Sequence, residues 1–408
     1  MNEIATDAVP EFPILRTCPF SVPDTYRKLD EVGGRVHQIR MSDGRLAWLI
    51  TKNEDARAVL SDARFSSEKL RPGFPELSPG GLKALTYFSP FLVNMDGPEH
   101  SHARRAVLSE FSVRRINAMK PRIQRIVDTA IDRLLAQPER PVDFVAHLAN
   151  PVPTLVLETF LGVPADDLDT IERNTEKMLR EARTEEEQRA AAEGLHAHLD
   201  AVIAAKEENP ADDFLSRQIE RSRRERGGAA DRFELASLVQ LLQIAGHASS
   251  AAMISLSVLT LLSDPEQLKE LAADPDRTPA AVEELLRFLS ITDTGPLRMA
   301  LEDVEIGGVR IRAGDGVIIP TLPANRDADA FPDPDRFDIR RTPDTRHVAF
   351  GYGAHQCLGQ NLVRAELQIL LDRLFSRVPD LRLAVDPGAL PFKYFGQFFG
   401  PSELPVTW

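Results

Sequence analysis

One short segment near the C-terminus constrains this chain more than any other. It places a single cysteine, Cys357, among closely spaced glycines, in the run Phe350-Gly351-Tyr352-Gly353-Ala354-His355-Gln356-Cys357-Leu358-Gly359. Glycines let the backbone turn tightly and approach a bulky, flat ligand closely. Residues 360–371 then repeat apolar positions with the period of a helix. We therefore expect Cys357 at a helix start, where backbone N–H groups and the helix dipole favour a thiolate.

A thiolate in an apolar, glycine-rich loop is suited to bind a metal. The sequence near Cys357 has no second cysteine and no cluster of histidines, so a zinc or iron–sulfur site is not expected. A lone thiolate suits haem iron, because it donates electron density that favours O–O cleavage. The alternative is a buried structural cysteine beside a glycine turn. It would be preferred for an isolated Cys-x-Gly, but not for the whole pattern.

The segment resembles the haem-binding loop of the cytochromes P450, Phe-Gly-x-Gly-x-(His/Arg)-x-Cys-x-Gly, and matches every fixed position. The resemblance runs from about residue 10 to the C-terminus. It implies a mainly α fold with a minor β portion, in which haem b (iron protoporphyrin IX) lies between a long central helix and the cysteine loop. It also implies that Cys357 binds the iron and that Phe350 and Gly351 adjoin the cofactor. We expect one domain over residues 1–408.

Haem carries two propionates, which need cationic partners. His100 and Arg104 are spaced to share one helix face, and the family uses a His-x-x-x-Arg pair here for propionates. Arg298 matches another propionate arginine, and His355 in the cysteine loop matches a third position. Each of these residues alone could equally be an ordinary surface cation.

A second family element stabilises the fold rather than taking part in the chemistry. Glu284 and Arg287 form a Glu-x-x-Arg pair on an expected helix, and the segment 331–337 resembles the family's second arginine element. The resemblance implies that Glu284, Arg287 and Arg336 form a buried network that supports the cysteine loop.

The segment from Leu235 to Ser263 contains no Asp, Glu, Lys or Arg and is long enough to cross a bilayer. Gln240, Gln243 and His247 interrupt it, and it lacks basic or aromatic flanks. We therefore expect a central helix of a soluble protein, without membrane contact.

This helix departs from the family at one functional position. The family pattern Ala-Gly-x-(Asp/Glu)-Thr supplies an acid and an alcohol that deliver protons to iron-bound dioxygen. Here Gly246 is matched, Ala248 replaces the acid and Ser249 replaces the threonine. Ser249 can still donate a hydrogen bond or orient water. Either Ser249, water or a substrate hydroxyl relays protons, or the enzyme performs epoxidation, oxidative coupling, peroxide use or nitric-oxide reduction.

Composition excludes several classes of protein. The net charge of -13 argues against a nucleic-acid partner. The two cysteines, Cys18 and Cys357, are far apart, which indicates a reducing compartment. The N-terminus lacks the features of a signal peptide. We expect a cytoplasmic monomer.

Basic residues gather between 104 and 125, with Glu110 as the one acid. Such a stretch can steer an acidic partner. In the family this region receives an electron donor. We expect a separate ferredoxin and ferredoxin reductase, since no flavin or iron–sulfur module is fused to this chain.

Together these features predict a haem-thiolate monooxygenase that hydroxylates or epoxidises a medium-to-large apolar substrate. The pattern most resembles tailoring enzymes of bacterial macrolide, polyketide or terpenoid biosynthesis. A peroxygenase is disfavoured, because no arginine lies between Leu235 and Ser263 to hold a fatty-acid carboxylate. A non-enzymatic haem-sensing or recruitment module is disfavoured by the intact cysteine loop. By family position, the segments that line the pocket are 66–94, 240–250, 291–294 and 397–399.

Local patterns predict the remaining elements. Strands are expected at 47–51, 316–320 and, as a hairpin around Gly307-Gly308, 304–311. Helices dominate from about 97 to 289, with breaks at Pro164, Asn209-Pro210 and Gly227-Gly228.

Overall fold

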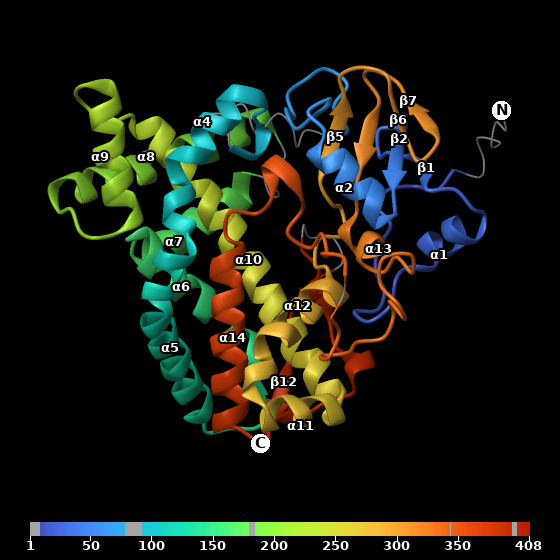
Figure 1. Ribbon diagram of the computed structural model, residues 1–408. Helices are drawn as coiled ribbons and strands as arrows, with labels where there is room; N and C mark the ends of the chain where they lie inside the picture. Colours follow the sequence, from blue (N-terminus) through green and yellow to red (C-terminus); the bar gives the residue numbers. More distant parts are fainter. Residues whose placement is uncertain (1–8, 78–91, 179–183, 343, 394–397) are drawn as a thin grey trace.

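The computed structural model describes residues 9–77, 92–178, 184–342, 344–393 and 398–408. Most helices occupy one side of the molecule and most strands gather on the other (Figure 1).

The helices are α1 (Asp24–Glu31), α2 (Asn53–Ser61), α4 (Gly97–Leu108), α5 (Val113–Leu135), α6 (Pro151–Leu161), α7 (Ala165–Glu176), α8 (Glu185–Glu208), α9 (Phe214–Arg226), α10 (Arg232–Ser263), α11 (Pro265–Ala273), α12 (Thr278–Leu289), α13 (Thr321–Asn325) and α14 (Gln360–Arg377). Short 3-10 or π turns are η3 (Leu92–Asn94), η4 (Ser109–Phe111), η5 (Val145–Ala149), η7 (Pro275–Arg277), η8 (Gly353–His355) and η9 (Pro387–Ala389). The mainly α prediction is confirmed.

The largest sheet has the strand order β1-β2-β8-β5-β3. Its strands are β1 (Val36–Arg40), β2 (Leu46–Ile50), β3 (Phe65–Ser66), β5 (Leu297–Ala300) and β8 (Gly316–Ile318). Within it, β2 and β8 run parallel and the other neighbours run antiparallel. The smaller sheets contain β4 (Val142–Asp143), β6 (Val304–Ile306), β7 (Val309–Ile311), β9 (Arg382–Leu383), β10 (Phe392–Lys393), β11 (Gly400–Pro401) and β12 (Pro405–Thr407). Gly307 and Gly308 both have positive φ, as the predicted two-residue hairpin requires.

The predicted helix breaks coincide with special backbone positions. Gly162 ends α6 in the left-handed conformation, and Pro164 directly precedes α7. A side chain at Gly162 would collide with Asp213, because an added Cβ would lie 2.1 Å from its carboxyl carbon. Gly227 ends α9 in the same left-handed conformation.

Helix α10 forms the centre of the helical region. It begins after Asp231, whose side chain accepts a hydrogen bond from the Glu234 backbone N–H. It packs against α6, α7, α8, α12 and α14. Within the described residues it is the one helix long and apolar enough to cross a membrane, but 61% of its most apolar window is buried inside the protein. The expected central core helix is therefore observed.

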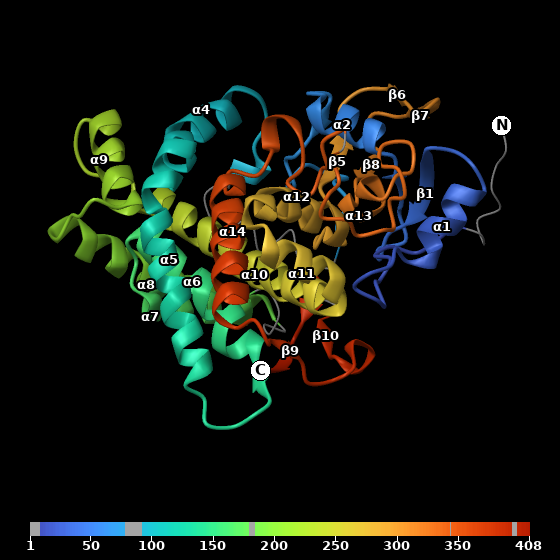
Figure 2. The ribbon, with the colours of Figure 1, turned by 60° about the horizontal axis from the view of Figure 1, so that its bottom comes forward.

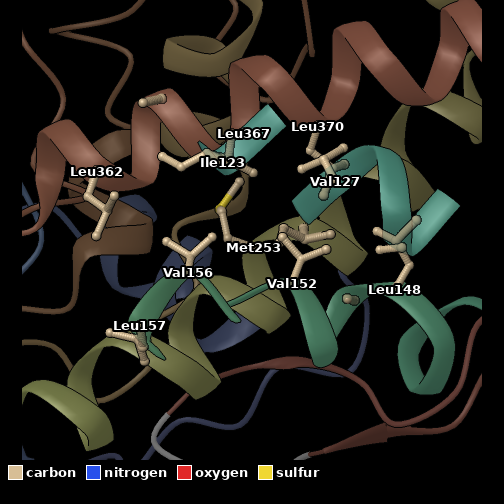
Figure 3. Packing of buried hydrophobic residues seen from close by; sticks show 14 of the residues in the cluster. Ile123, Val127, Leu148, Val152, Val156, Leu157, Met253, Leu362, Leu367 and Leu370 are labelled. Atoms are coloured by element: carbon tan, nitrogen blue, oxygen red, sulfur yellow. The ribbon is translucent and has the colours of Figure 1, made fainter. Parts of the chain in front are cut away.

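The main core lies between α5, α6, α10 and α14. Helix α14 lies beside α5 in both views of the ribbon (Figures 1 and 2). Figure 3 shows side chains from these helices meeting in one apolar layer, namely Ile123, Val127, Val152, Val156, Met253, Leu362, Leu367 and Leu370. This layer fixes α14, whose N-terminal end follows the cysteine loop, against the central helix.

The predicted network around Glu284 is present, but the prediction that the Arg336 side chain belongs to it was wrong. Arg287 donates to both carboxylate oxygens of Glu284, at 2.7 and 2.8 Å, and both side chains are buried. The second arginine that reaches Glu284 is Arg341, at 3.1 Å, rather than Arg336. Arg336 is exposed and contributes only its backbone carbonyl, which accepts from Arg287 and Arg341. The chain turns after Arg336, so the side chain of Arg341, five residues further on, reaches Glu284 in its place.

We predict that Arg287→Ala destabilises the protein by about 3 to 5 kcal/mol, because it leaves Glu284 buried without its main partner. Urea unfolding followed by helical circular dichroism measures this loss. Arg310→Ala is the control, because Arg310 pairs with Asp303 at the surface, and should change stability little. Equal stability of the two variants would show that the Glu284 network does not hold the fold together.

Candidate active site

The cysteine loop is closed by its own backbone. The N–H of Cys357 donates to the carbonyl of Phe350 at 2.9 Å. Gly351 and Gly353 both have positive φ, where other residues are strained. An added Cβ at Gly353 would lie 2.5 Å from the backbone oxygen of Leu60. The glycines therefore let the loop turn and press directly onto α2.

Cys357 lies three positions before Gln360, the first residue of α14. It is therefore within one helical turn of the helix start, as the sequence predicted. The backbone N–H groups of Gly359 and Gln360 hydrogen-bond to its sulfur, and the positive charge of Arg104 acts on it. These interactions favour the thiolate. Burial nevertheless outweighs them and raises the pKa of the Cys357 thiol. The backbone N–H groups at the helix start thus favour the thiolate, as the sequence predicted, and a metal cation bound by the sulfur would favour it further.

Helix α10 exposes one face in the middle of its length. Ala245 and Ala248 are exposed although many residues further along the helix in both directions are buried. Ser249 is half-buried beside them, one turn after Ala245, and its hydroxyl donates to the Ala245 carbonyl at 2.5 Å. Gly246 packs on α6, where an added Cβ would lie 3.0 Å from the Leu157 side chain.

Another face of α10 carries a polar contact that sequence reasoning missed. His247 bonds through Nδ1 to Glu172 of α7 at 3.0 Å and through Nε2 to the backbone oxygen of Asn150 at 3.3 Å. Gln243 donates to the same Glu172 carboxylate at 3.2 Å. Burial lowers the pKa of His247, but its bonds to Glu172 outweigh that effect and raise it overall. Gln243 and His247, which interrupt the apolar segment, thus hydrogen-bond α10 to α7.

Four predicted cationic residues lie in one region. The imidazoles of His100 and His355 stack with ring centroids 4.0 Å apart. The Nε2 atom of His100 is buried and has no hydrogen-bond partner in the described parts of the chain. Arg104 donates to the backbone carbonyl of Gln356 at 2.6 Å, beside the cysteine. Arg298 is buried, and the bond recorded for its side chain is to its neighbour's backbone oxygen, Leu297.

This region has more cationic groups than carboxylates. Burial lowers the pKa of Arg298 to about 10 and that of His355 to about 3. The carboxylate that acts on Arg298, His100 and His355 is Asp96. Asp96 already accepts hydrogen bonds from the Ser66 hydroxyl and the Ser67 backbone. Sequence analysis missed Asp96, although an acid directly before the helix start at Gly97 is a recognisable signal.

The structure describes only some of the segments that were predicted to line the pocket. Asp293 does not present a free carboxylate, because Arg16 pairs with it and donates to the Leu289 and Ser290 carbonyls. Phe399 is buried, with the Arg16 guanidinium 4.6 Å from its ring centre. Residues 78–91 and 394–397 lie outside the described chain. These contacts show that part of the 291–294 and 397–399 segments anchors the N-terminal residues.

The basic stretch lies on α4 and α5. Arg114, Arg122 and Arg125 are exposed, and no ion pair is recorded for them within the described residues. Arg115 instead pairs at 3.4 Å with Glu110, a buried carboxylate that also accepts from Arg217 of α9. The acid within the stretch is therefore structural, and the free positive charge lies on the other arginines.

Comparison with known proteins agrees with this geometry. A family model described as Cytochrome P450 matches residues 178–379. Pentalenic acid synthase of Streptomyces avermitilis is 45% identical over 401 residues, covering 97% of each chain. The crystal structure of cytochrome P450 MoxA from Nonomuraea recticatena is 49% identical, covers 98% of each chain and superposes with a TM-score of 0.89. That of the mycinamicin VIII C21 methyl hydroxylase MycCI from Micromonospora griseorubida is 39% identical, with a TM-score of 0.89, covering 98% of this chain and 100% of its own.

The chain belongs to the cytochrome P450 family and is a monooxygenase of that family. Membership implies a haem-iron cofactor. The described residues fit such a group on two grounds. A lone thiol lies in a loop closed by glycines, and buried cationic or imidazole groups nearby lack enough carboxylates. Two propionates would supply that missing negative charge.

We predict that Cys357→Ser abolishes the red-shifted, thiolate-type carbonyl spectrum of the reduced protein, because serine supplies no thiolate. Difference spectroscopy of the purified protein with carbon monoxide measures this. Cys18→Ser is the matched control and should keep the native spectrum. A native spectrum in Cys357→Ser would show that another residue binds the iron.

Proposed function

We propose that this protein holds haem b through Cys357 and inserts an oxygen atom from dioxygen into an apolar substrate of medium to large size. The observation that carries the proposal is the lone thiol in its glycine loop, close to a buried group of cations. His100, Arg104, Arg298 and His355 would bind the two propionates. Phe350 and Gly351 would adjoin the macrocycle.

The protein's own residues would position this chemistry. The bound haem iron supplies dioxygen activation. Ser249 is half-buried beside the exposed Ala245 and Ala248 of α10 and would orient water or dioxygen with its hydroxyl. Gly246 lets this part of α10 pack closely on α6. Ala248 leaves the position next to Ser249 without a proton donor.

The substrate proposal rests on the relatives. One relative is named for the synthesis of pentalenic acid, and a structural neighbour is named as a hydroxylase of mycinamicin VIII. We infer that this chain hydroxylates or epoxidises a compound of bacterial natural-product biosynthesis, of the macrolide, polyketide or terpenoid kind. The absence of arginine between Leu235 and Ser263 gives no support to a peroxygenase reaction.

Electrons would come from a separate ferredoxin and its reductase in the cytoplasm, with the protein acting as a monomer. The exposed arginines of α4 and α5 would attract an acidic donor.

We predict that reversing Arg114 and Arg122 to Glu slows reduction by ferredoxin about tenfold at low salt and flattens its salt dependence. Stopped-flow reduction measures the rate. The control reverses Arg310 and Arg312, which are exposed on the strand side of the molecule, and should keep the native rate. An unchanged rate in the Arg114/Arg122 variant would place the docking site elsewhere.

We predict that Ser249→Ala lowers product formed per electron about tenfold and raises peroxide release, because one positioned hydroxyl is lost. Turnover with a ferredoxin system and a screened substrate measures both quantities. Ser255→Ala is the control, because Ser255 makes the same kind of bond to a carbonyl one turn earlier on α10, at 2.8 Å, but is buried. Native coupling in Ser249→Ala would remove Ser249 from the proton route.

A further inference from the structure

Arg16, in the N-terminal segment, has a buried guanidinium that the proposed chemistry has not used. The residue is 1% exposed, and its hydrogen bonds reach residues 273 to 277 positions further along the chain. Its Nε donates to the Asp293 carboxylate at 2.9 Å, its Nη1 to the Leu289 carbonyl at 2.7 Å and its Nη2 to the Ser290 carbonyl at 2.8 Å. A planar guanidinium that is bound at several points fixes the relative positions of its partners.

The two carbonyls that accept from Arg16 lie at the end of α12. Leu289 is the last residue of α12, and Ser290 follows it in the left-handed conformation, with a φ of 38°. The last carbonyls of a helix have no partner within the helix, and the helix dipole favours a cation beside them. A left-handed residue other than glycine is also strained unless its surroundings hold it. Arg16 supplies the donors that hold the chain in this turn.

The turn sets the course of residues 290–296, which join α12 to β5. Further along, Gly295 presses on the neighbouring backbone, because an added Cβ would lie 2.1 Å from the carbonyl oxygen of Ile319. Arg298, one of the buried cationic residues near the cysteine loop, follows in β5. The segment that leads to Arg298 is therefore fixed at its start by Arg16 and near its end by Gly295.

The same guanidinium also contacts the C-terminal part of the chain. Its central carbon lies 4.6 Å from the ring centre of Phe399, and the Phe399 N–H donates to the Ile291 carbonyl at 2.9 Å. The next residue, Gly400, packs on α10, where an added Cβ would lie 3.1 Å from the Ala252 Cβ. Ala252 is one turn beyond the exposed Ala248 and shares its helix face. The contacts of this guanidinium thus extend to the face of α10 where the proposed chemistry takes place.

The ion pair with Asp293 also decides the polarity of this region. Burial raises the pKa of the Asp293 carboxyl, and the Arg16 guanidinium opposes that rise. A buried carboxylate is costly when its cationic partner is removed. Because the carboxylate bonds to Arg16, the apolar side chains of Ile291 and Phe399 lie beside a charge that is already paired.

We propose that Arg16 is a positioning residue for substrate specificity, because it joins Ser290, Asp293 and Phe399 and so fixes the two segments that border the exposed face of α10. The inference rests on the proposed monooxygenase function and adds a residue that sets the shape of its pocket. Arg16 acts through these segments and does not touch the substrate. The substrate that such a paired, largely apolar wall fits is bulky and uncharged.

The test compares two ligands that bind haem iron through an imidazole nitrogen and differ in size. Clotrimazole carries three aromatic rings that need the pocket wall, whereas imidazole reports on the iron alone. In the purified holoprotein, Arg16→Met should weaken clotrimazole binding about tenfold and change imidazole binding less than about twofold, because the wall is no longer held in place. Optical difference titrations measure both dissociation constants.

Arg27→Met is the matched control. Arg27 also lies in the N-terminal region, but it is exposed and pairs with Asp335 at 3.9 Å, so both dissociation constants should stay native. Arg16→Lys keeps a cation beside Asp293 and loses the fork of donors, so it should weaken clotrimazole binding less than Arg16→Met does. Equal ratios of the two dissociation constants in Arg16→Met and Arg27→Met would overturn the proposal.

The two ligands and the carbonyl spectrum separate this inference from a structural role and from the function beneath it. An equal loss of affinity for both ligands in Arg16→Met would mean a general disturbance of the fold and would overturn the specificity role. Should Arg16→Met not retain haem, Arg16→Lys decides, and a native ratio in that variant refutes the proposal. A native protein without the thiolate-type carbonyl spectrum would instead refute the monooxygenase function itself.

Discussion

The contact between the cysteine loop and its surroundings is the constraint on which the rest of the structure depends. Gly353 lets the loop lie against the backbone of Leu60, and Arg104 donates to the carbonyl of Gln356. The Glu284 network holds the segment that leads into the loop. These interactions place one thiol at a fixed point near the start of α14, where burial raises its pKa and the backbone N–H groups of Gly359 and Gln360 oppose that rise. A metal cation bound by the sulfur would favour the thiolate further.

Charge burial explains the region around the propionate candidates as well. An arginine, a second arginine beside the cysteine and two stacked histidines gather where Asp96 is the acid that acts on them. Such a group is costly without negative partners. It becomes favourable when a dianionic cofactor supplies them. Arg104 and Arg298 would thus bind the propionates of the haem, and His100 and His355 could donate hydrogen bonds to them.

Helix α10 connects the site to the remainder of the fold. One face, with Ala245 and Ala248, is exposed in the middle of a core helix, and another face bonds to α7 through Gln243 and His247. Ala248 has no acid, so the Ser249 hydroxyl is the neighbouring group able to donate a hydrogen bond.

Much of this arrangement could be predicted from the sequence, because local patterns determine it. The cysteine loop, the central helix, the Gly307-Gly308 hairpin and the helix breaks follow from residues close in sequence. The errors concern contacts made across the fold. Arg336 could not be distinguished from Arg341, since only the turn between them decides which reaches Glu284. His247 interrupts an apolar segment, but its partner Glu172 on α7 is set only by packing.

The central claim is that Cys357 binds the iron as a thiolate. Iron-edge X-ray absorption of the native protein, purified with its cofactor, tests this most directly, because sulfur scatters differently from nitrogen and oxygen. The account predicts one sulfur neighbour of the iron in addition to the macrocycle nitrogens, and loss of that sulfur in Cys357→Ser. An iron surrounded only by nitrogen and oxygen in the native protein would contradict it.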